Sequence, residues 1–384
     1  MQRLRRVLVV GAGLAGPAVA RGLAALGIDV DLIEVRAESA EPGAGLLLTG
    51  NALLALDALG VGDAVRTAGR AVHAVRYADA EDRELFRLAI PRAWPAFVSI
   101  HRAALRRVLL EHPPALAVRF DTTLDRLETR SDSVRVRFAV GDEADYDLLI
   151  GADGVHSRLR AQLFGGGAPA PIPGYAGWRC VAASPVEIAE PTYLLGNGRT
   201  LLLHPLRGGE IYCGAGPIDE RAIPGAGDDL ARLRAAFAGF TGPAARFLAA
   251  LPSDLRLAPT RYWEIAQAPW HRGRSVLIGD AAHACAPTLA QGAALAFEDA
   301  VVLCELLSRS PDVESSLTHF EAQRRVRVES VQRASRARID ANRALAPHAH
   351  RVRDHVLRAV GARQLEAAWA PLMQERHERL EARR

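Results

Sequence analysis

Residues 6–16 read RVLVVGAGLAG, a short apolar run that leads directly into a glycine-rich turn. The apolar run, Val7–Val10, is continuous rather than alternating, which is typical of a parallel strand buried on both faces. A helical pattern follows over residues 16–26, and residues 30–34 form a second extended stretch. The order of strand, turn, helix and strand predicts a βαβ unit, and hence an α/β fold built on a parallel sheet.

The turn GAGLAG fits the G-x-G-x-x-G pattern and is followed about 20 residues later by an acidic residue, Glu34. In this pattern Gly11 permits the tight turn, Gly13 lets backbone N–H groups approach a pyrophosphate, and Gly16 allows close helix–strand contact. Glu34 would accept hydrogen bonds from a ribose diol. The alternative is that the glycines serve only the turn. The expected dinucleotide contacts are Gly11, Gly13, Leu14, Ala15, Gly16, Glu34, Val35 and Arg36.

Two later segments repeat the arrangement of an apolar run followed by glycine. One is GADGVHSRLR at residues 151–160, and the other is GDAAHACAPTLAQGAALAFEDA at residues 279–300. Together with GAGLAG, they resemble in order and separation the three FAD-binding segments of the single-component (class A) FAD-dependent aromatic hydroxylases, a family of flavoprotein monooxygenases. The resemblance covers residues 11–300 and continues in HFEAQRR at residues 319–325.

The resemblance implies specific contacts to FAD. Asp280 would hold a ribityl hydroxyl and Arg102, in the segment SIHRAAL, would lie near the phosphates, as suits an acceptor-only carboxylate and a guanidinium. The N-terminus of the helix after Pro287 would face the flavin pyrimidine edge. The chain departs from the family's commoner pattern PxxGQGxN at Ala290 and Ala294. The remaining cofactor-binding positions implied are Asp153, Pro287, Gln291, Gly292 and Ala293.

The same resemblance implies a monooxygenase. NAD(P)H would reduce FAD, O2 would add at flavin C4a, and the resulting hydroperoxide would hydroxylate or epoxidise an electron-rich, aromatic small molecule. The chain has no second G-x-G-x-x-G, which fits a nicotinamide that binds only transiently. A flavin halogenase is disfavoured because the chain has no Lys and no WxWxIP segment. The open alternatives are a nicotinamide dehydrogenase, an FAD-dependent oxidase or reductase on the same fold, and a non-catalytic flavin- or ligand-binding protein.

The composition changes between the motifs, where Pro, Gly and aromatic residues occur with period-two stretches that are typical of strands. We therefore expect a Rossmann-like FAD-binding domain, an inserted sheet-rich substrate domain and C-terminal helices. The predicted boundaries are 1–71, 102–170 and 266–345 for the FAD-binding domain, 72–101 and 171–265 for the substrate-binding domain, and 346–384 for the C-terminal helical segment.

The inserted domain also supplies the candidates for a substrate pocket. Tyr212, Arg199 and His204 are the principal ones, although such side chains on a half-buried strand are more often core than pocket. Tyr212 matches a substrate-side Tyr of the urate hydroxylases, but Thr288 stands where those enzymes carry an Asp, which disfavours a purine substrate. The further candidates are His73, Tyr175 and Trp178.

Composition excludes several other classes of protein. The chain has 384 residues, 49% of them hydrophobic and 24% charged, and no apolar run long enough to span a bilayer. Its net charge of +4 is dispersed, which disfavours a nucleic-acid partner. The four cysteines form no CxxC pair, so neither a metal site nor a disulfide frame is expected. We expect a cytoplasmic monomer or homodimer whose partners are a small-molecule substrate and O2.

Overall fold

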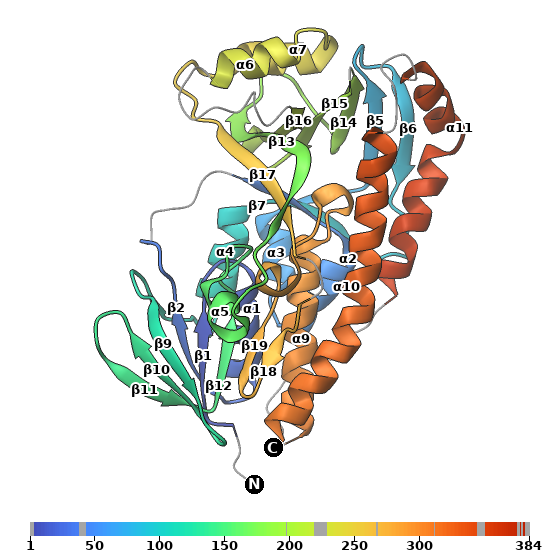
Figure 1. Cartoon of the computed structure of the whole chain (residues 1–384). Coiled ribbons are helices and arrows are strands. Elements are labelled where there is room, and N and C mark those ends of the chain that lie inside the picture. The colour runs from blue at the N-terminus through green and yellow to red at the C-terminus, as the bar shows by residue number, and fades with distance from the viewer. Residues whose placement is uncertain are drawn as a thin grey trace.

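A six-stranded sheet forms the lower part of the molecule in Figure 1. The strand order is β18-β19-β12-β1-β2-β8, and every neighbouring pair is parallel except β18–β19. The computed structural model describes residues 4–37, 44–196, 198–218, 229–265, 268–310, 312–343, 350–374, 377 and 379–380. The strands of this sheet are β1 (Arg6–Val10), β2 (Asp29–Ile33), β8 (Val118–Arg119), β12 (Leu148–Gly151), β18 (His271–Arg272) and β19 (Ser275–Leu277).

The apolar runs that precede the three glycine motifs lie side by side at the centre of this sheet. Val9 of β1 pairs with Ile150 of β12, and Ile150 pairs with Val276 of β19. All three side chains are fully buried, as expected for strands covered on both faces. Because the carboxyl ends of parallel strands meet at one edge, the three motifs converge there. The predicted Rossmann-like α/β fold is confirmed.

Helices cover this sheet and connect its strands. The first, α1 (Ala15–Ala25), follows β1 and packs against α9 (Gly292–Arg309), which in turn packs against α10 (Val313–Arg343). Within the described residues, no helix is both long and apolar enough to cross a membrane. The other helices of this part are α2 (Gly50–Ala58), α3 (Gly62–Ala68), α4 (Arg102–Glu111), α5 (Arg158–Phe164) and α8 (Asp280–His283).

A seven-stranded mixed sheet lies above the first in Figure 1, in the order β17-β13-β16-β15-β14-β5-β6. One face packs against α6 (Asp229–Ala236) and α7 (Gly242–Ala250), two helices that the strand-rich prediction for residues 171–265 did not include. The strands are β5 (Ala74–Asp79), β6 (Glu84–Ala89), β13 (Ala170–Ala183), β14 (Thr192–Gly196), β15 (Arg199–Pro205), β16 (Glu210–Ile218) and β17 (Ala258–Glu264).

Two small sheets complete the strands, each with three of them. In the first, β7 (Phe97–His101) pairs with β3 (Gly45–Leu48) and β4 (Arg70–Val72). Only β5 and β6 of the predicted strands in residues 72–101 therefore join the large sheet. The second sheet is antiparallel and consists of β9 (Leu124–Thr129), β10 (Val134–Phe138) and β11 (Glu143–Tyr146).

The C-terminal part is helical, as predicted. Helix α11 (His350–Trp369) packs against β6, where a side chain at Gly361 would come within 2.4 Å of the Phe86 ring. The long helix α10 runs beside it in Figure 1. The predicted boundary between residues 345 and 346 lies outside the described residues.

Candidate functional site

A cavity of about 810 Å³ lies between the carboxyl edge of the first sheet and the inner face of the second. Every cofactor-binding residue predicted from the sequence lines it except Gly16. The first strand, turn and helix contribute Gly11, Gly13, Leu14 and Ala15, and the end of β2 contributes Glu34, Val35 and Arg36. The later segments contribute Arg102, Asp153, Asp280, Pro287, Gln291, Gly292 and Ala293.

The three glycines of the first turn have different roles. Gly11 has φ +105°, and a Cβ there would lie 2.4 Å from the Ala152 carbonyl oxygen. A Cβ at Gly16 would lie 1.8 Å from the Gly11 carbonyl oxygen. The fold itself therefore requires both residues. A Cβ at Gly13 would meet only the Arg102 Nη2 atom, at 3.5 Å, so this backbone is open to the cavity.

The Glu34 carboxylate accepts hydrogen bonds from two backbone N–H groups at the glycine-rich turn and at the end of β2. Its Oε2 accepts the Ala12 N–H at 2.9 Å, and its Oε1 accepts the Arg36 N–H at 3.0 Å. A carboxylate has about four acceptor positions, so two contacts leave capacity for a ligand. Because Glu34 also lines the cavity, the carboxylate holds the turn and faces a ligand at the same time.

Asp153 brings a buried carboxylate to the same edge. Its Oδ2 accepts the Leu159 N–H at 3.1 Å, while its buried Oδ1 has no hydrogen-bond partner in the described part of the chain. Burial raises the pKa of Asp153, and a hydrogen bond with Ser157 opposes that shift. Arg160 donates to the Ala281 carbonyl at 2.7 Å, so it ties this motif to the one at residues 279–300.

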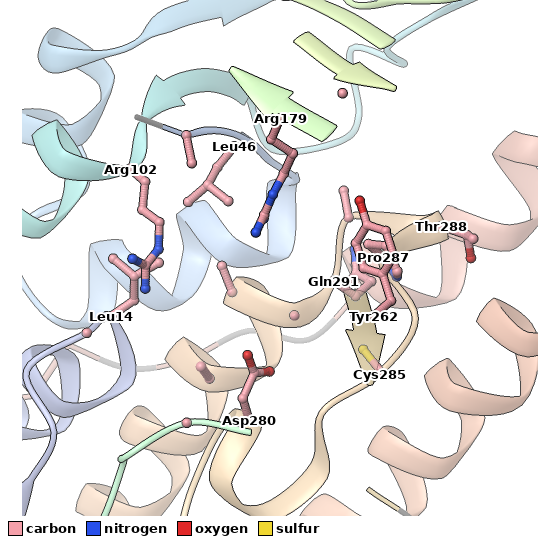
Figure 2. Close-up of a pocket in the computed structure, with 18 of the residues that line it drawn as sticks. Leu14, Leu46, Arg102, Arg179, Tyr262, Asp280, Cys285, Pro287, Thr288 and Gln291 are labelled. Carbon is pink, nitrogen blue, oxygen red and sulfur yellow. The ribbon is translucent and has the colours of Figure 1, made fainter. Parts of the chain in front are cut away.

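Asp280 and Arg102 face the cavity from opposite walls in Figure 2. Burial raises the pKa of Asp280, whereas His283 and Arg102 lower it. The structure gives the Asp280 carboxylate no hydrogen bond to any described residue, so its acceptor capacity is available to a ligand. The unpaired carboxylate and the guanidinium near Gly13 are the groups that a sugar hydroxyl and a phosphate would need.

Residues 285–293 form the wall next to Asp280. Pro287–Leu289 make a 3-10 turn, and Ala290 then adopts φ +56°, the left-handed conformation that the family's usual glycine takes without strain. The Gln291 side chain is fixed by hydrogen bonds with Asn51, at 2.9 Å, and Thr49, at 3.0 Å. Helix α9 begins at Gly292, where a Cβ would meet nothing within 4 Å, so its first N–H groups are open to the cavity.

Two other side chains of this segment offer neither a general base nor a nucleophile. His283 Nε2 lies 2.6 Å from Asp299 Oδ2 in the core, and Cys285 lines the cavity with a pKa that burial raises to about 12. A thiol in that state is a poor nucleophile. No group of three His, Cys, Asp or Glu residues among those described could hold a metal ion.

The second sheet turns an aromatic face toward the cavity. His204 and Tyr212, two of the predicted pocket residues, line it, as do Tyr175 and Thr288. Arg199 does not, and this prediction is corrected. Side chains alternate along a strand, so Thr200, Leu202 and His204 of β15 face the cavity while Arg199 belongs to the opposite face, with Leu201 and Leu203. Trp178 and His73 are also outside the lining.

Several lining residues were missed because they come from distant segments. Figure 2 shows Arg179 of β13 and Tyr262 of β17 pointing into the same space. Arg179 Nε donates to Thr260 Oγ1 at 2.6 Å. The period-two pattern of β13 places Arg179 and Trp178 on opposite faces, but sequence alone did not show which face the cavity would occupy. Other missed residues include Tyr77, Phe86, Tyr193, Arg338 and Arg353.

Comparison with known proteins matches residues 5–171 and 252–335 to a family model described as an FAD binding domain. The FAD-dependent urate hydroxylase of Klebsiella pneumoniae is 33% identical over 355 residues, which cover 87% of this chain and 90% of that protein. The chain belongs to the FAD-dependent flavoprotein monooxygenase family. A 6-hydroxynicotinate 3-monooxygenase of Bordetella bronchiseptica is 30% identical, with 87% of this chain and 91% of the relative covered.

A solved member of the family has the same fold. The crystal structure of Klebsiella pneumoniae HpxO complexed with FAD and uric acid matches with a TM-score of 0.85 at 28% identity, covering 96% of each chain. The cavity residues of the present flavoprotein monooxygenase fit FAD by their own chemistry. The open backbone at Gly13 and the guanidinium of Arg102 suit phosphates, and the unpaired carboxylate of Asp280 suits a sugar hydroxyl.

Proposed function

We propose that this flavoprotein uses NAD(P)H and O2 to hydroxylate or epoxidise a small, electron-rich aromatic or heteroaromatic substrate. The observation that carries the proposal is one continuous cavity, lined at one end by the three FAD motifs and at the other by the aromatic face of the second sheet. The relatives named as urate hydroxylase and 6-hydroxynicotinate 3-monooxygenase act on heteroaromatic rings, which supports this substrate class.

We assign cofactor binding to the predicted FAD-binding domain and substrate binding to the predicted inserted domain. FAD, when bound, supplies electron transfer and the activation of O2. The residues of the first domain would hold it, with Gly13 and Arg102 at the phosphates, Glu34 at the adenosine ribose and Asp280 at the ribityl chain. The N–H groups at the start of α9 would favour negative charge on the flavin.

The chain's own groups at the substrate end bind and orient rather than ionise. Burial lowers the pKa of His204 to about 3, so its ring is neutral at physiological pH. Burial raises the pKa of Tyr212, and the nearby charge of Arg179 opposes this shift without restoring an ordinary value. Tyr212 therefore remains a neutral hydroxyl. Together these side chains would hold a ring and exclude water from the reacting atoms.

A purine is not the substrate we propose. Thr288 lines the cavity, but its hydroxyl donates to the Ser335 carbonyl at 3.0 Å, so this position offers neither an acid nor a free donor. The relative named 6-hydroxynicotinate 3-monooxygenase therefore represents the proposed substrate class better than the urate hydroxylase does.

The test is a panel of phenols, aromatic acids and nitrogen heterocycles, scored for substrate-dependent NAD(P)H oxidation and for product carrying oxygen from ¹⁸O2. We expect at least one substrate to stimulate oxidation and to gain a single labelled atom. Rapid mixing of reduced protein with O2 would then reveal any transient flavin species. If reoxidation yields only hydrogen peroxide with every compound, the protein is an oxidase or reductase on the same fold.

A further inference from the structure

One wall of the cavity carries a row of rings, one from each of five neighbouring strands. We call Phe86, Tyr77, Tyr193, His204 and Tyr212 the aromatic row. Neighbouring ring centroids are 4.4, 4.5, 5.5 and 6.0 Å apart, in that order. All five side chains line the cavity. Phe86, Tyr77 and Tyr193 stack face to face, so they present ring edges to the cavity, and an aromatic ligand can pack edge-to-face against this wall.

One guanidinium reaches this surface from the other wall. Arg338 extends from α10 into the cavity, and its charge acts on the hydroxyls of Tyr77 and Tyr193. Neighbouring arginines are already paired, since Arg353 bonds Asp354 at 2.6 Å and Arg336 bonds Glu264. No carboxylate in the described part of the chain pairs with Arg338. A half-buried cation without a counter-ion is a natural partner for an anionic ligand.

The two tyrosines add neutral donors at the same place. Burial raises the pKa of Tyr77 and of Tyr193, and the Arg338 charge only partly opposes the shift. Both hydroxyls therefore keep their protons and can donate to an anion. The buried ring of His204 follows in the row, and neither of its nitrogens has a hydrogen-bond partner among the described residues. These nitrogens are buried, so His204 contributes its ring and not a hydrogen bond to the cavity wall.

We propose that Arg338, Tyr77 and Tyr193 form the binding site for a carboxylate of the substrate, and that the aromatic row packs against the substrate's ring. The proposal rests on the proposed function, because it assigns the substrate class of the same cavity. It makes Arg338 a specificity-determining residue and predicts an aromatic acid rather than a neutral phenol.

The distance between the two ends of the aromatic row indicates how long the bound acid should be. Tyr212 packs against Gly45, where a Cβ would lie 2.4 Å from the Tyr212 Cβ, and the adjacent Ala44 carbonyl accepts the Arg102 N–H at 2.8 Å. Tyr212 thus marks the FAD end of the row. Tyr77 lies three strands away, or about 14 Å at about 4.8 Å per strand. A carboxylate joined to its ring by a spacer reaches both ends better than a benzoate does.

Isothermal titration of the oxidised, FAD-loaded protein tests the site directly. The probes are 4-hydroxycinnamate, 4-hydroxybenzoate and the amide of each acid. We expect 4-hydroxycinnamate to bind about tenfold or more tightly than its amide, as a charge-assisted pair implies, and more tightly than 4-hydroxybenzoate. Arg338→Gln should abolish the preference for acid over amide, and Arg338→Lys should restore part of it. Arg333→Gln, on the exposed side of the same helix, is the matched control and should change nothing.

Two further variants keep the test decisive. If Arg338→Gln does not fold, Tyr193→Phe should weaken binding of the acid several-fold and leave the amide unchanged. Arg179→Gln should preserve the acid preference, because Arg179 lies at the other end of the row. The proposal is overturned if wild-type protein does not prefer the acid, if Arg338→Gln keeps the preference, or if Arg179→Gln loses it. Acid binding that depends on Arg338, combined with no ¹⁸O transfer to any compound of the substrate panel, would instead refute the monooxygenase function and leave the site standing.

Discussion

Alanine substitution at two glycines of the first turn should separate cofactor binding from folding. Gly13 and Gly16 belong to the same motif, but their surroundings differ. A Cβ at Gly16 would lie 1.8 Å from the Gly11 carbonyl oxygen, whereas a Cβ at Gly13 would have only the flexible end of Arg102 within reach, at 3.5 Å. We therefore expect Gly16→Ala to damage the fold and Gly13→Ala to damage the binding of FAD.

The expected magnitudes follow from these contacts. Backbone surrounds Gly16 and cannot move aside cheaply, so the overlap should cost about 3 kcal/mol or more, against which the better helix propensity of Ala returns about 1 kcal/mol. For a chain of 384 residues, the net loss of about 2 kcal/mol or more corresponds to a melting temperature about 2–3 °C lower or more. Gly13→Ala should leave the stability of the apoprotein within about 0.5 kcal/mol of wild type. Its methyl group would instead occupy the space that a phosphate needs.

The assay compares thermal melting of the apoproteins with FAD affinity measured by quenching of flavin fluorescence. Gly13→Ala should melt like wild type and bind FAD at least tenfold more weakly, so it should also lose the stabilisation that bound cofactor gives. Gly16→Ala should melt earlier before any FAD is added. Full FAD affinity in Gly13→Ala, or an unchanged melting temperature in Gly16→Ala, would refute the roles assigned to this turn.

Three further changes test other parts of the site. Asp280→Asn should weaken FAD binding by about 1.5–3 kcal/mol in fluorescence titrations, yet leave the stability of the apoprotein nearly unchanged, because the carboxylate is exposed in the cavity and has no hydrogen bond to a described residue. Ala290→Gly should raise the free energy of unfolding in urea by about 0.5–1 kcal/mol, since it relieves a left-handed alanine at φ +56°. Burial raises the pKa of Glu321, but hydrogen bonds with His271 and Arg325 outweigh it and bring the value to about 2. This contribution is complete above pH 4.5 and is lost as pH falls toward 2, so Glu321→Gln should flatten acid unfolding over that range by about 1–2 kcal/mol.

The FAD end of the cavity could be predicted because its determinants are local. Each of the three motifs joins a buried apolar run to a glycine, and parallel pairing of β1, β12 and β19 then brings the motifs to one edge. The parallel order of these strands fixes the relative positions of the three motifs, whatever sequence lies between them. This is why residues as far apart as Gly13 and Asp280 could be assigned to one cavity without any knowledge of the intervening chain.

The substrate end resisted prediction because its determinants are not local. The aromatic row takes one ring from each of five strands, and β14 pairs with β5, more than 100 residues earlier in the chain. The alternation of side chains along β15 correctly places Arg199 and His204 on opposite faces of the sheet. It does not show which of the two faces lines the cavity. Arg338 lies in a charged helix with several arginines, and the sequence pattern does not show which of them faces the cavity. Only the packing of α10 distinguishes it from Arg333.

The acidic pair in the motif at residues 279–300 shows how charge can serve a cofactor site without touching the cofactor. Glu298 and Asp299 are fully buried, which would cost several kcal/mol per charge if they were unpaired. Arg324, from the segment HFEAQRR, bonds Glu298 at 2.9 Å and Asp299 at 2.8 Å. Asn51 donates both to Glu298, at 2.7 Å, and to Gln291.

The network therefore joins α2, α9 and α10 at the point where α9 begins. Asp299 also accepts the Gly279 N–H at 2.9 Å, so the same carboxylate fixes the residue that precedes Asp280. The backbone groups proposed to face FAD are thus held by ion pairs behind them. A segment that must lie against a flat ring can be rich in alanine and glycine only if its rigidity comes from elsewhere, and the buried pair with Arg324 supplies it.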